Sequence, residues 1–208
     1  MKRYKDIIFD LGCVILEICR KGTFEYWAKR SGVDADELMG RYKNREFYYK
    51  FEKGLIDEKV FREKTLEILE IDLSREDFIE GWNRWIVGYI PGVMDMVAEI
   101  PREYRRVVLS NTNEIHAGYC RRKFPEIFKH FDVIFFSHEI GLRKPEPEIY
   151  EHVINNLNAE PDKILYFDDH IEYLEPAGRL GIKGVCVNSP EDIIEGLEEA
   201  DILPKKCN

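Results

Sequence analysis

Short apolar runs recur along the chain, and each of them closes on polar residues. The runs are rich in β-branched and aromatic side chains and cover residues 5–10, 105–112, 132–139, 162–169 and 183–189. Continuous apolar runs of this length are typical of strands buried on both faces, as in a parallel sheet. Helical patterns accompany the later runs, over residues 92–100, 113–124, 146–157, 171–180 and 190–199. This alternation predicts an α/β fold with a doubly wound parallel sheet.

A long stretch between the first two runs has no comparable strand pattern and is expected to be helical throughout. Apolar residues after Ser74 recur at helical spacing, and Ser74 is in the position of an N-cap residue. Another helix is expected to begin at Asp57. We therefore assign residues 17–90 to an all-helical insertion, and residues 1–16 and 91–208 to the α/β core. The insertion would overhang the end of the first strand.

Composition and charge exclude several classes of protein. Hydrophobic residues make up 44% and charged residues 34% of the 208 residues, as in ordinary globular proteins. The formal net charge of -9 disfavours nucleic acids and anionic membranes as partners, and no apolar run reaches the ~20 residues of a membrane span. Five cysteines without a C-x-x-C pair indicate neither a disulfide framework nor a zinc site. We expect a soluble, cytoplasmic protein with reduced thiols; the sequence leaves its oligomeric state open.

Polar side chains close three of the runs, at the edge where open α/β sheets bind ligands. They are Asp10 in the first run, Ser110 and Asn111 in the second, and Asp168 and Asp169 in the fourth. Each of them alone could merely cap a helix or close a turn. Their occurrence at the ends of successive strands, however, indicates a site. Clustered carboxylates repel one another unless a cation intervenes, and oxygen ligands suit magnesium better than zinc.

Lys144 adds an ammonium group to this edge, in the segment GLRKPEP. A lysine is expected there if an anion binds. A carboxylate can attack phosphorus to give an acyl phosphate, which splits one difficult displacement into two easier ones. A metal ion and a lysine would then offset the charge on the phosphoryl oxygens. The residues thus indicate a site for a small phosphorylated molecule.

Four segments resemble, in order, the four motifs of the haloacid dehalogenase superfamily. They are IIFDLGCVI, VVLSNTN, GLRKPEPEIY and YFDDHIEYLEPAGRLGI. The resemblance implies a Rossmann-like core with a helical cap inserted between the first and second motifs. Within the superfamily, the segments SNTNEIH, RKPEPEIYEHV and GWNRW resemble bacterial phosphatases that act on α-D-glucose 1-phosphate.

The resemblance also implies a role for each residue that binds or attacks the phosphate. Asp10 would be the nucleophile. Ser110 and Asn111, with the amides that follow Ser110, would hold the phosphoryl oxygens. Lys144 would bridge the nucleophile and the phosphate.

A magnesium site is implied in the same way. Asp10 and Asp169 would be ligands through their side chains, and Gly12 through its backbone carbonyl. Asp168 could ligate the ion directly or through water. Mg²⁺ is therefore the expected cofactor.

Two positions depart from the motifs. Phosphatases of the superfamily usually carry at position 12 a second aspartate that acts as general acid and base, and this chain has Gly12. Its loss should weaken turnover of esters with poor leaving groups, whereas hemiacetal phosphates have better leaving groups. Glu17, His170 or Glu172 could substitute for it. Tyr173 stands where the fourth motif often has Asn or Asp, which affects a hydrogen bond near the metal.

Several other side chains have two interpretations. His116 is expected to pack rather than to react. Arg41, Arg45 and Lys53 could face a phosphate or the solvent. Aromatic residues of the insertion could line a substrate pocket or form its core. They are Phe24, Tyr26, Trp27, Phe47, Tyr48, Tyr49 and Phe51.

The sequence therefore predicts a magnesium-dependent phosphatase of small phosphorylated metabolites, such as glucose 1-phosphate, working through an aspartyl phosphate. One alternative is a metal-independent 2-haloacid dehalogenase-type hydrolase, which would use the same nucleophile on carbon. The acidic pair Asp168 and Asp169 disfavours it, because attack on carbon gains little from a cation site. The other alternative is a non-catalytic protein that binds a phosphorylated metabolite. Gly12 and Tyr173 would then be departures from the motifs that accompanied the loss of activity.

Overall fold

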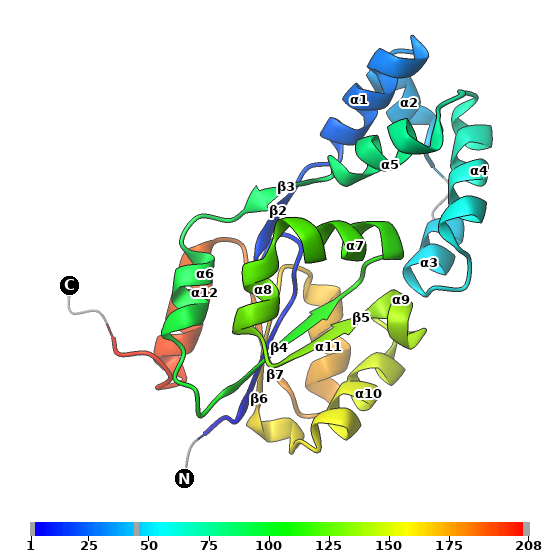
Figure 1. Ribbon diagram of the computed structural model, residues 1–208. Coiled ribbons are helices and arrows are strands. Elements are labelled where there is room, and N and C mark those ends of the chain that lie inside the picture. Colours follow the sequence, from blue (N-terminus) through cyan, green and yellow to red (C-terminus); the bar gives the residue numbers. More distant parts are fainter. Residues whose placement is uncertain (1–2, 44–45, 206–208) are drawn as a thin grey trace.

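A five-stranded parallel sheet forms the centre of the protein in a computed structural model that describes residues 3–43 and 46–205 (Figure 1). Its strands are β1 (Asp6–Phe9), β4 (Arg105–Ser110), β5 (Val133–Phe136), β6 (Ile164–Asp168) and β7 (Lys183–Cys186). Their order across the sheet is β5-β4-β1-β6-β7. From β1 the chain winds first to one side and then to the other. The doubly wound sheet predicted from the apolar runs is confirmed.

Helices cover both faces of the sheet, which explains why the strands are apolar at successive positions. Ile7 and Phe9 pack into the cluster on one face, and Ile8 packs into the cluster on the other. The first face carries α6 (Val93–Glu99), α7 (Glu114–Lys123), α8 (Pro125–His130) and α12 (Pro190–Glu199). The second face carries α10 (Pro147–Leu157) and α11 (Ile171–Arg179). The short helix α9 (Ser137–Ile140) follows β5, and a 3-10 turn (Pro161–Lys163) precedes β6.

A helical lobe stands over the sheet, between β1 and α6 in the chain (Figure 1). Its helices are α1 (Lys21–Ser31), α2 (Ala35–Arg41), α3 (Glu46–Glu52), α4 (Glu58–Leu69) and α5 (Arg75–Asn83), and we call them the cap. The predicted helix starts are confirmed, since Asp57 accepts a hydrogen bond from the Val60 amide at 2.8 Å and Ser74 from the Asp77 amide at 3.0 Å.

The insertion is not helical throughout. Its two ends pair as an antiparallel ribbon of β2 (Leu16–Ile18) and β3 (Ile86–Tyr89), which joins the cap to the core. The expectation for residues 17–90 was wrong there, because strands of three and four residues are too short to show a period.

Aromatic residues fill the interior of the cap. Phe61 stacks on Phe51 with ring centroids 4.1 Å apart, and Trp27 stacks on Phe78 at 4.9 Å. Ile115 of α7 packs into the same cluster, so the apolar interior of the cap extends onto the core. Phe24, Trp27 and Phe51 are therefore core residues of the cap, as one of the two interpretations expected.

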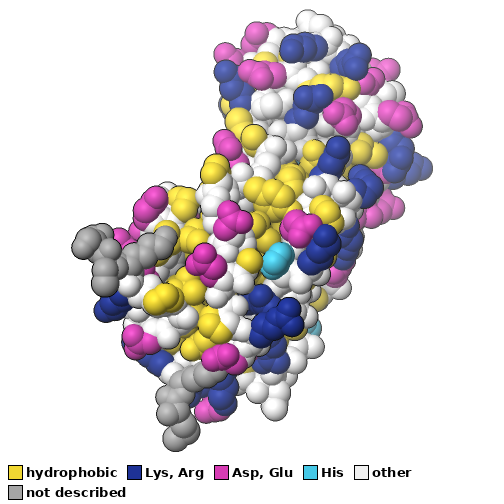
Figure 2. Space-filling model, turned by 60° about the vertical axis from the view of Figure 1, so that its left-hand side comes forward, with side chains coloured by type: hydrophobic (Ala, Val, Ile, Leu, Met, Phe, Trp, Pro, Cys, Tyr) yellow, Lys and Arg dark blue, Asp and Glu magenta, His cyan; other side chains and the backbone are white. Residues whose placement is uncertain are grey.

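The molecule narrows between core and cap, and hydrophobic side chains gather at this waist (Figure 2). A groove of about 710 Å³ lies between α1, the end of α5, β3 and Tyr119, and charged side chains such as Glu25 and Arg84 form much of its lining. Among the described residues, no helix is long and apolar enough to cross a bilayer. Cys13, Cys19, Cys120 and Cys186 are free thiols, and Cys207 lies outside the described residues.

Candidate active site

A cleft of about 480 Å³ lies between the cap and the carboxyl ends of β1, β4 and β6. Parallel strands bring the polar residues that close them to one edge, as predicted. The predicted site residues that line the cleft are Asp10, Gly12, Ser110, Asn111 and Asp169. Lys144 and Asp168 lie behind this lining and are fully buried. All seven predicted residues are thus brought together.

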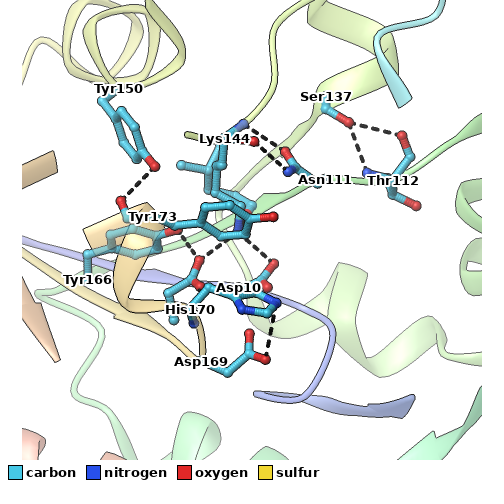
Figure 3. Close-up of polar contacts among 12 residues, drawn as sticks. Asp10, Asn111, Thr112, Ser137, Lys144, Tyr150, Tyr166, Asp169, His170 and Tyr173 are labelled. Carbon is cyan, nitrogen blue, oxygen red and sulfur yellow. Dashed lines mark hydrogen bonds and ion pairs between the residues drawn. The ribbon is translucent and has the colours of Figure 1, made fainter. Parts of the chain in front are cut away.

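Lys144 lies between two carboxylates (Figure 3). Its Nζ is 3.0 Å from Oδ1 of Asp10 and 2.7 Å from Oδ2 of Asp168, and it donates to the Leu109 carbonyl at 3.1 Å. Burial alone would lower the pKa of Lys144, but the two carboxylates outweigh burial and raise it. The lysine is therefore charged, and its position is fixed by three acceptors.

Asp168 has both carboxylate oxygens in hydrogen bonds. Oδ2 accepts from Lys144 and from the Tyr166 hydroxyl, and Oδ1 accepts from the His170 amide at 2.9 Å. Asp169 differs, because its side chain faces the cleft and lies as far as 3.6 Å from His170 Nε2. Asp169 is therefore better placed than Asp168 to bind a further ligand.

Three acidic side chains form a cluster that fits a divalent cation. Asp10, Asp168 and Asp169 each offer an oxygen within 4.8 Å of the others. Burial raises the pKa of Asp10 to about 7, Lys144 opposes this, and the two neighbouring carboxylates add to it. A carboxylate this hard to ionise is stabilised by a cation, and carboxylate oxygens are ligands that magnesium prefers.

Asn111 holds the backbone of Lys144 with both ends of its amide. Oδ1 accepts from the Lys144 amide at 2.8 Å, and Nδ2 donates to the Lys144 carbonyl at 2.9 Å (Figure 3). Ser137 joins the same loops, since its hydroxyl exchanges hydrogen bonds of 2.9 Å with the backbone of Thr112. The Asn111 side chain is thus engaged, so a phosphate contact at this position would come from its backbone. The sequence did not reveal the roles of Ser137 or Tyr166, which depend on tertiary contacts.

The candidate substitutes for the missing acid differ in position. His170 lines the cleft, whereas the side chain of Glu172 is 59% exposed. Glu17 is exposed on β2, and its neighbours Leu16 and Ile18 line the cleft instead. His170 is therefore the best placed of the three.

Tyr173 lines the cleft and covers Lys144, with its ring centre 5.1 Å from Nζ. Its backbone carbonyl accepts a hydrogen bond of 2.6 Å from the Tyr150 hydroxyl. Where the motif often has an Asn or Asp, this chain therefore places an aromatic ring beside the lysine. The contact is of the cation–π kind.

His116 is buried and packs against the cap, and it also lines the cleft. Its ring stacks on Trp82 with centroids 5.2 Å apart, and Nε2 lies 3.0 Å from the Trp82 carbonyl. Burial lowers the pKa of His116 to about 4, so the ring is neutral near pH 7.

The cap wall contains residues that sequence reasoning missed. Glu52 at the end of α3 lines the cleft, together with Arg20 and Trp85, and it pairs with Arg143 of the core at 3.1 Å. Tyr48, an aromatic residue of the insertion, also lines the cleft, as one of the two interpretations expected. No local pattern marks Glu52, because a charged residue at a helix end usually faces solvent.

Of the basic residues that could face a phosphate or the solvent, Arg41 and Lys53 form ion pairs and do not line the cleft. Arg41 pairs with Glu37 at 2.6 Å, within the cap. Lys53 pairs with Glu146 at 2.8 Å, across the contact between cap and core. Arg45 lies outside the described residues.

Known proteins resemble the chain in sequence and in structure. A model of the haloacid dehalogenase-like hydrolase family matches residues 24–181. D-ribitol-5-phosphate phosphatase of Bacteroides thetaiotaomicron is 26% identical over 188 residues, which cover 86% of this chain and 89% of that protein. Phosphorylated carbohydrates phosphatase of Thermotoga maritima is 28% identical over 121 residues, 56% of each chain. 

A solved structure gives the same picture. It is a haloacid dehalogenase family enzyme of Bacteroides thetaiotaomicron in complex with magnesium and inorganic phosphate. It superposes with a TM-score of 0.79 at 26% identity, over 88% of this chain and 93% of that one. Together with the family match, this shows that the chain belongs to the haloacid dehalogenase-like hydrolases.

Proposed function

We propose that the protein is a magnesium-dependent phosphatase of small phosphorylated metabolites, with sugar and sugar-alcohol phosphates as its substrates. The observation that carries the proposal is the cleft-facing carboxylate of Asp10, 3.0 Å from a buried ammonium and next to Asp169. Two relatives support it, since they are named as phosphatases of D-ribitol 5-phosphate and of phosphorylated carbohydrates. Glucose 1-phosphate, suggested by the sequence, is a second candidate substrate.

Asp10 is the nucleophile in this proposal. One of its carboxylate oxygens attacks phosphorus, the bond from phosphorus to the ester oxygen breaks, and the leaving oxygen takes a proton from water to give the alcohol. Water then attacks the aspartyl phosphate at phosphorus, which releases inorganic phosphate and restores Asp10. Lys144 and the Ser110 hydroxyl offset the charge on the phosphoryl oxygens.

Asp10, Asp169 and the Gly12 carbonyl would hold the magnesium ion, because all three residues line the cleft. A bound magnesium ion would supply positive charge to the phosphoryl oxygens. Asp168 contributes from behind, since its oxygens already accept hydrogen bonds and one of them anchors Lys144. It is a positioning residue for the lysine.

Because residue 12 is glycine, the side chain that usually donates a proton to the leaving group is absent. A Cβ atom at this position would lie 3.2 Å from Cγ1 of Ile18, so that side chain of β2 limits the space. Turnover should then be faster for esters with good leaving groups, among them hemiacetal phosphates.

Phosphate release from ribitol 5-phosphate and glucose 1-phosphate tests the proposal. We expect release with magnesium, none in a chelator, and a fall of about 10⁴-fold or more in the Asp10→Asn variant. Asp95→Asn, at an exposed position of α6, is the matched control and should behave as the wild type. Unchanged turnover by Asp10→Asn would overturn the proposal. Halide release from a 2-haloacid in a chelator would favour the dehalogenase alternative, and binding without turnover the non-catalytic one.

A further inference from the structure

Glu52 brings a carboxylate from the cap into the wall of the cleft. It ends α3 and is only 4% exposed, although acidic side chains are almost never this buried unless they are paired. Tyr48, one turn earlier on α3, lines the same wall. The cleft therefore has acidic groups at two places, on the core and on the cap.

Glu52 has two polar partners, Arg143 and Tyr48. Its Oε2 accepts from Nε of Arg143 at 3.2 Å and lies 3.1 Å from Nη2, and the Tyr48 hydroxyl is a further hydrogen-bond partner. Burial raises the pKa of Glu52, while the Arg143 charge lowers it. A carboxylate has about four acceptor sites, so the group can accept more hydrogen bonds than these.

The position of Glu52 relative to the catalytic lysine is fixed. Arg143 directly precedes Lys144 in the chain, and the next cap residue, Lys53, pairs with Glu146 at 2.8 Å. Gly54 then lies against the core, since a Cβ there would be 2.3 Å from the His138 carbonyl oxygen. Its φ of 64° also favours glycine. The end of α3 is thus attached to the core on both sides of Lys144.

We propose that Glu52 is a specificity-determining residue whose carboxylate accepts hydrogen bonds from hydroxyl groups of the substrate. This inference rests on the proposed function and deepens it. The phosphoryl group lies at Asp10 and Lys144, and the hydroxylated part of the molecule extends toward the cap. Hydroxyl groups are donors that a carboxylate can accept from, whereas a second phosphate or carboxylate would be repelled by it. The cleft then selects monophosphates of polyols.

The test compares two esters that differ in their hydroxyl groups. Ribitol 5-phosphate carries them, and n-pentyl phosphate has the same carbon chain without them. In the Glu52→Gln variant we expect kcat/KM for ribitol 5-phosphate to fall about tenfold to a hundredfold, the value of a hydrogen bond to a charged group. For n-pentyl phosphate the change should stay within about twofold, because no hydroxyl is bound.

Lys53→Met is the matched control. It removes the neighbouring ion pair between cap and core but leaves the cleft lining intact. It should change the two rates equally and by little. Glu52→Asp keeps a charge beside Arg143 and shortens the side chain, so it provides a second variant if Glu52→Gln folds poorly. It should show the same selective loss.

Two outcomes would overturn the inference while the proposed function stands. Equal losses on both esters would mean that Glu52 only holds the cap in place or donates a proton to the leaving group. Unchanged kinetics in both Glu52 variants would mean that it contacts no substrate. If the wild type released phosphate from neither ester nor from p-nitrophenyl phosphate, the proposed function itself would fail, and the role of Glu52 with it.

Discussion

The two walls of the cleft are built in different ways. On the core side, charged groups lie behind the surface in a short network, with Lys144 in contact with Asp10 and Asp168. On the cap side, Tyr48 stacks on Trp85 in the same wall as Glu52, and the ion pair of Glu52 with Arg143 crosses to the core. The core wall is thus suited to hold reacting atoms in place, and the cap wall is suited to distinguish substrates.

The difference also has a consequence for stability. Buried charges destabilise strongly when one partner is removed, whereas aromatic pairs contribute about 0.5–1.5 kcal/mol each beyond their burial. Substitutions in the core wall should therefore affect both chemistry and folding. In the cap wall, uncharged polar groups should mainly affect which substrate is bound, whereas the buried Glu52, paired with Arg143, should also contribute to folding.

The largest effect is expected from Lys144→Met. The variant leaves the Asp10 and Asp168 carboxylates buried without their cation, so the free energy of unfolding should fall by about 3–5 kcal/mol and phosphate release should be lost. Urea denaturation at pH 7 measures the loss of stability. Lys53→Met is the control; because its ion pair is partly exposed, its loss should lower the free energy of unfolding by less than about 1 kcal/mol. Equal stability of the two variants would show that the core network contributes no more than the contact with the cap.

Substitutions of Asp168 and of Asp169 should have different effects, although both residues belong to the core wall. Asp169→Asn should raise the magnesium concentration for half-maximal activity by about tenfold or more and leave the urea midpoint nearly unchanged, because the side chain faces the cleft. Asp168→Asn should lower the free energy of unfolding by about 2–3 kcal/mol, because Lys144 loses a charged partner and one of the two acceptor oxygens is replaced by an NH2 donor. If Asp168→Asn changed the magnesium dependence and Asp169→Asn lowered the stability, the roles assigned to the two residues would be wrong.

The smallest effect concerns His116, at the boundary between core and cap. Its folded pKa of about 4 is below the ordinary value of 6.5, so the unfolded chain takes up a proton first as pH falls. The histidine's contribution to stability is complete above pH 6.5 and decreases toward pH 4. From pH 7 to pH 5.5, the wild type should lose about 1 kcal/mol more than His116→Gln. Urea titrations at the two pH values measure these losses. If the wild type and His116→Gln lost the same stability, His116 would not be a neutral, buried ring.

Much of the core follows from the sequence. Strands buried on both faces give continuous apolar runs, so β1, β4, β5, β6 and β7 were all predicted. The longer helices agree with α6, α7, α10, α11 and α12 to within one residue at each end. Helices α8 and α9 and the ribbon β2–β3 were missed, since segments this short show no period.

The candidate site follows from the sequence in part, since Lys144 was predicted from the segment GLRKPEP and other residues from their positions at strand ends. Asp10, Ser110 and Asp169 were found in this way. The engaged oxygens of Asp168 and the contact between Glu52 and Arg143 depend on partners far along the chain, and no local pattern encodes them. The superfamily is confirmed. The narrower resemblance to glucose 1-phosphate phosphatases and the boundaries at residues 17 and 90 remain predictions.

Trapping the covalent intermediate tests the central claim most directly. Wild-type protein is mixed with magnesium and ribitol 5-phosphate or glucose 1-phosphate, quenched in acid during turnover, cleaved and examined by mass spectrometry. We expect a phosphoryl group on the peptide that contains Asp10, and none on that peptide in Asp10→Asn. A phosphoryl group on a different residue, or phosphate release at the wild-type rate by Asp10→Asn, would contradict the assignment of Asp10 as the nucleophile.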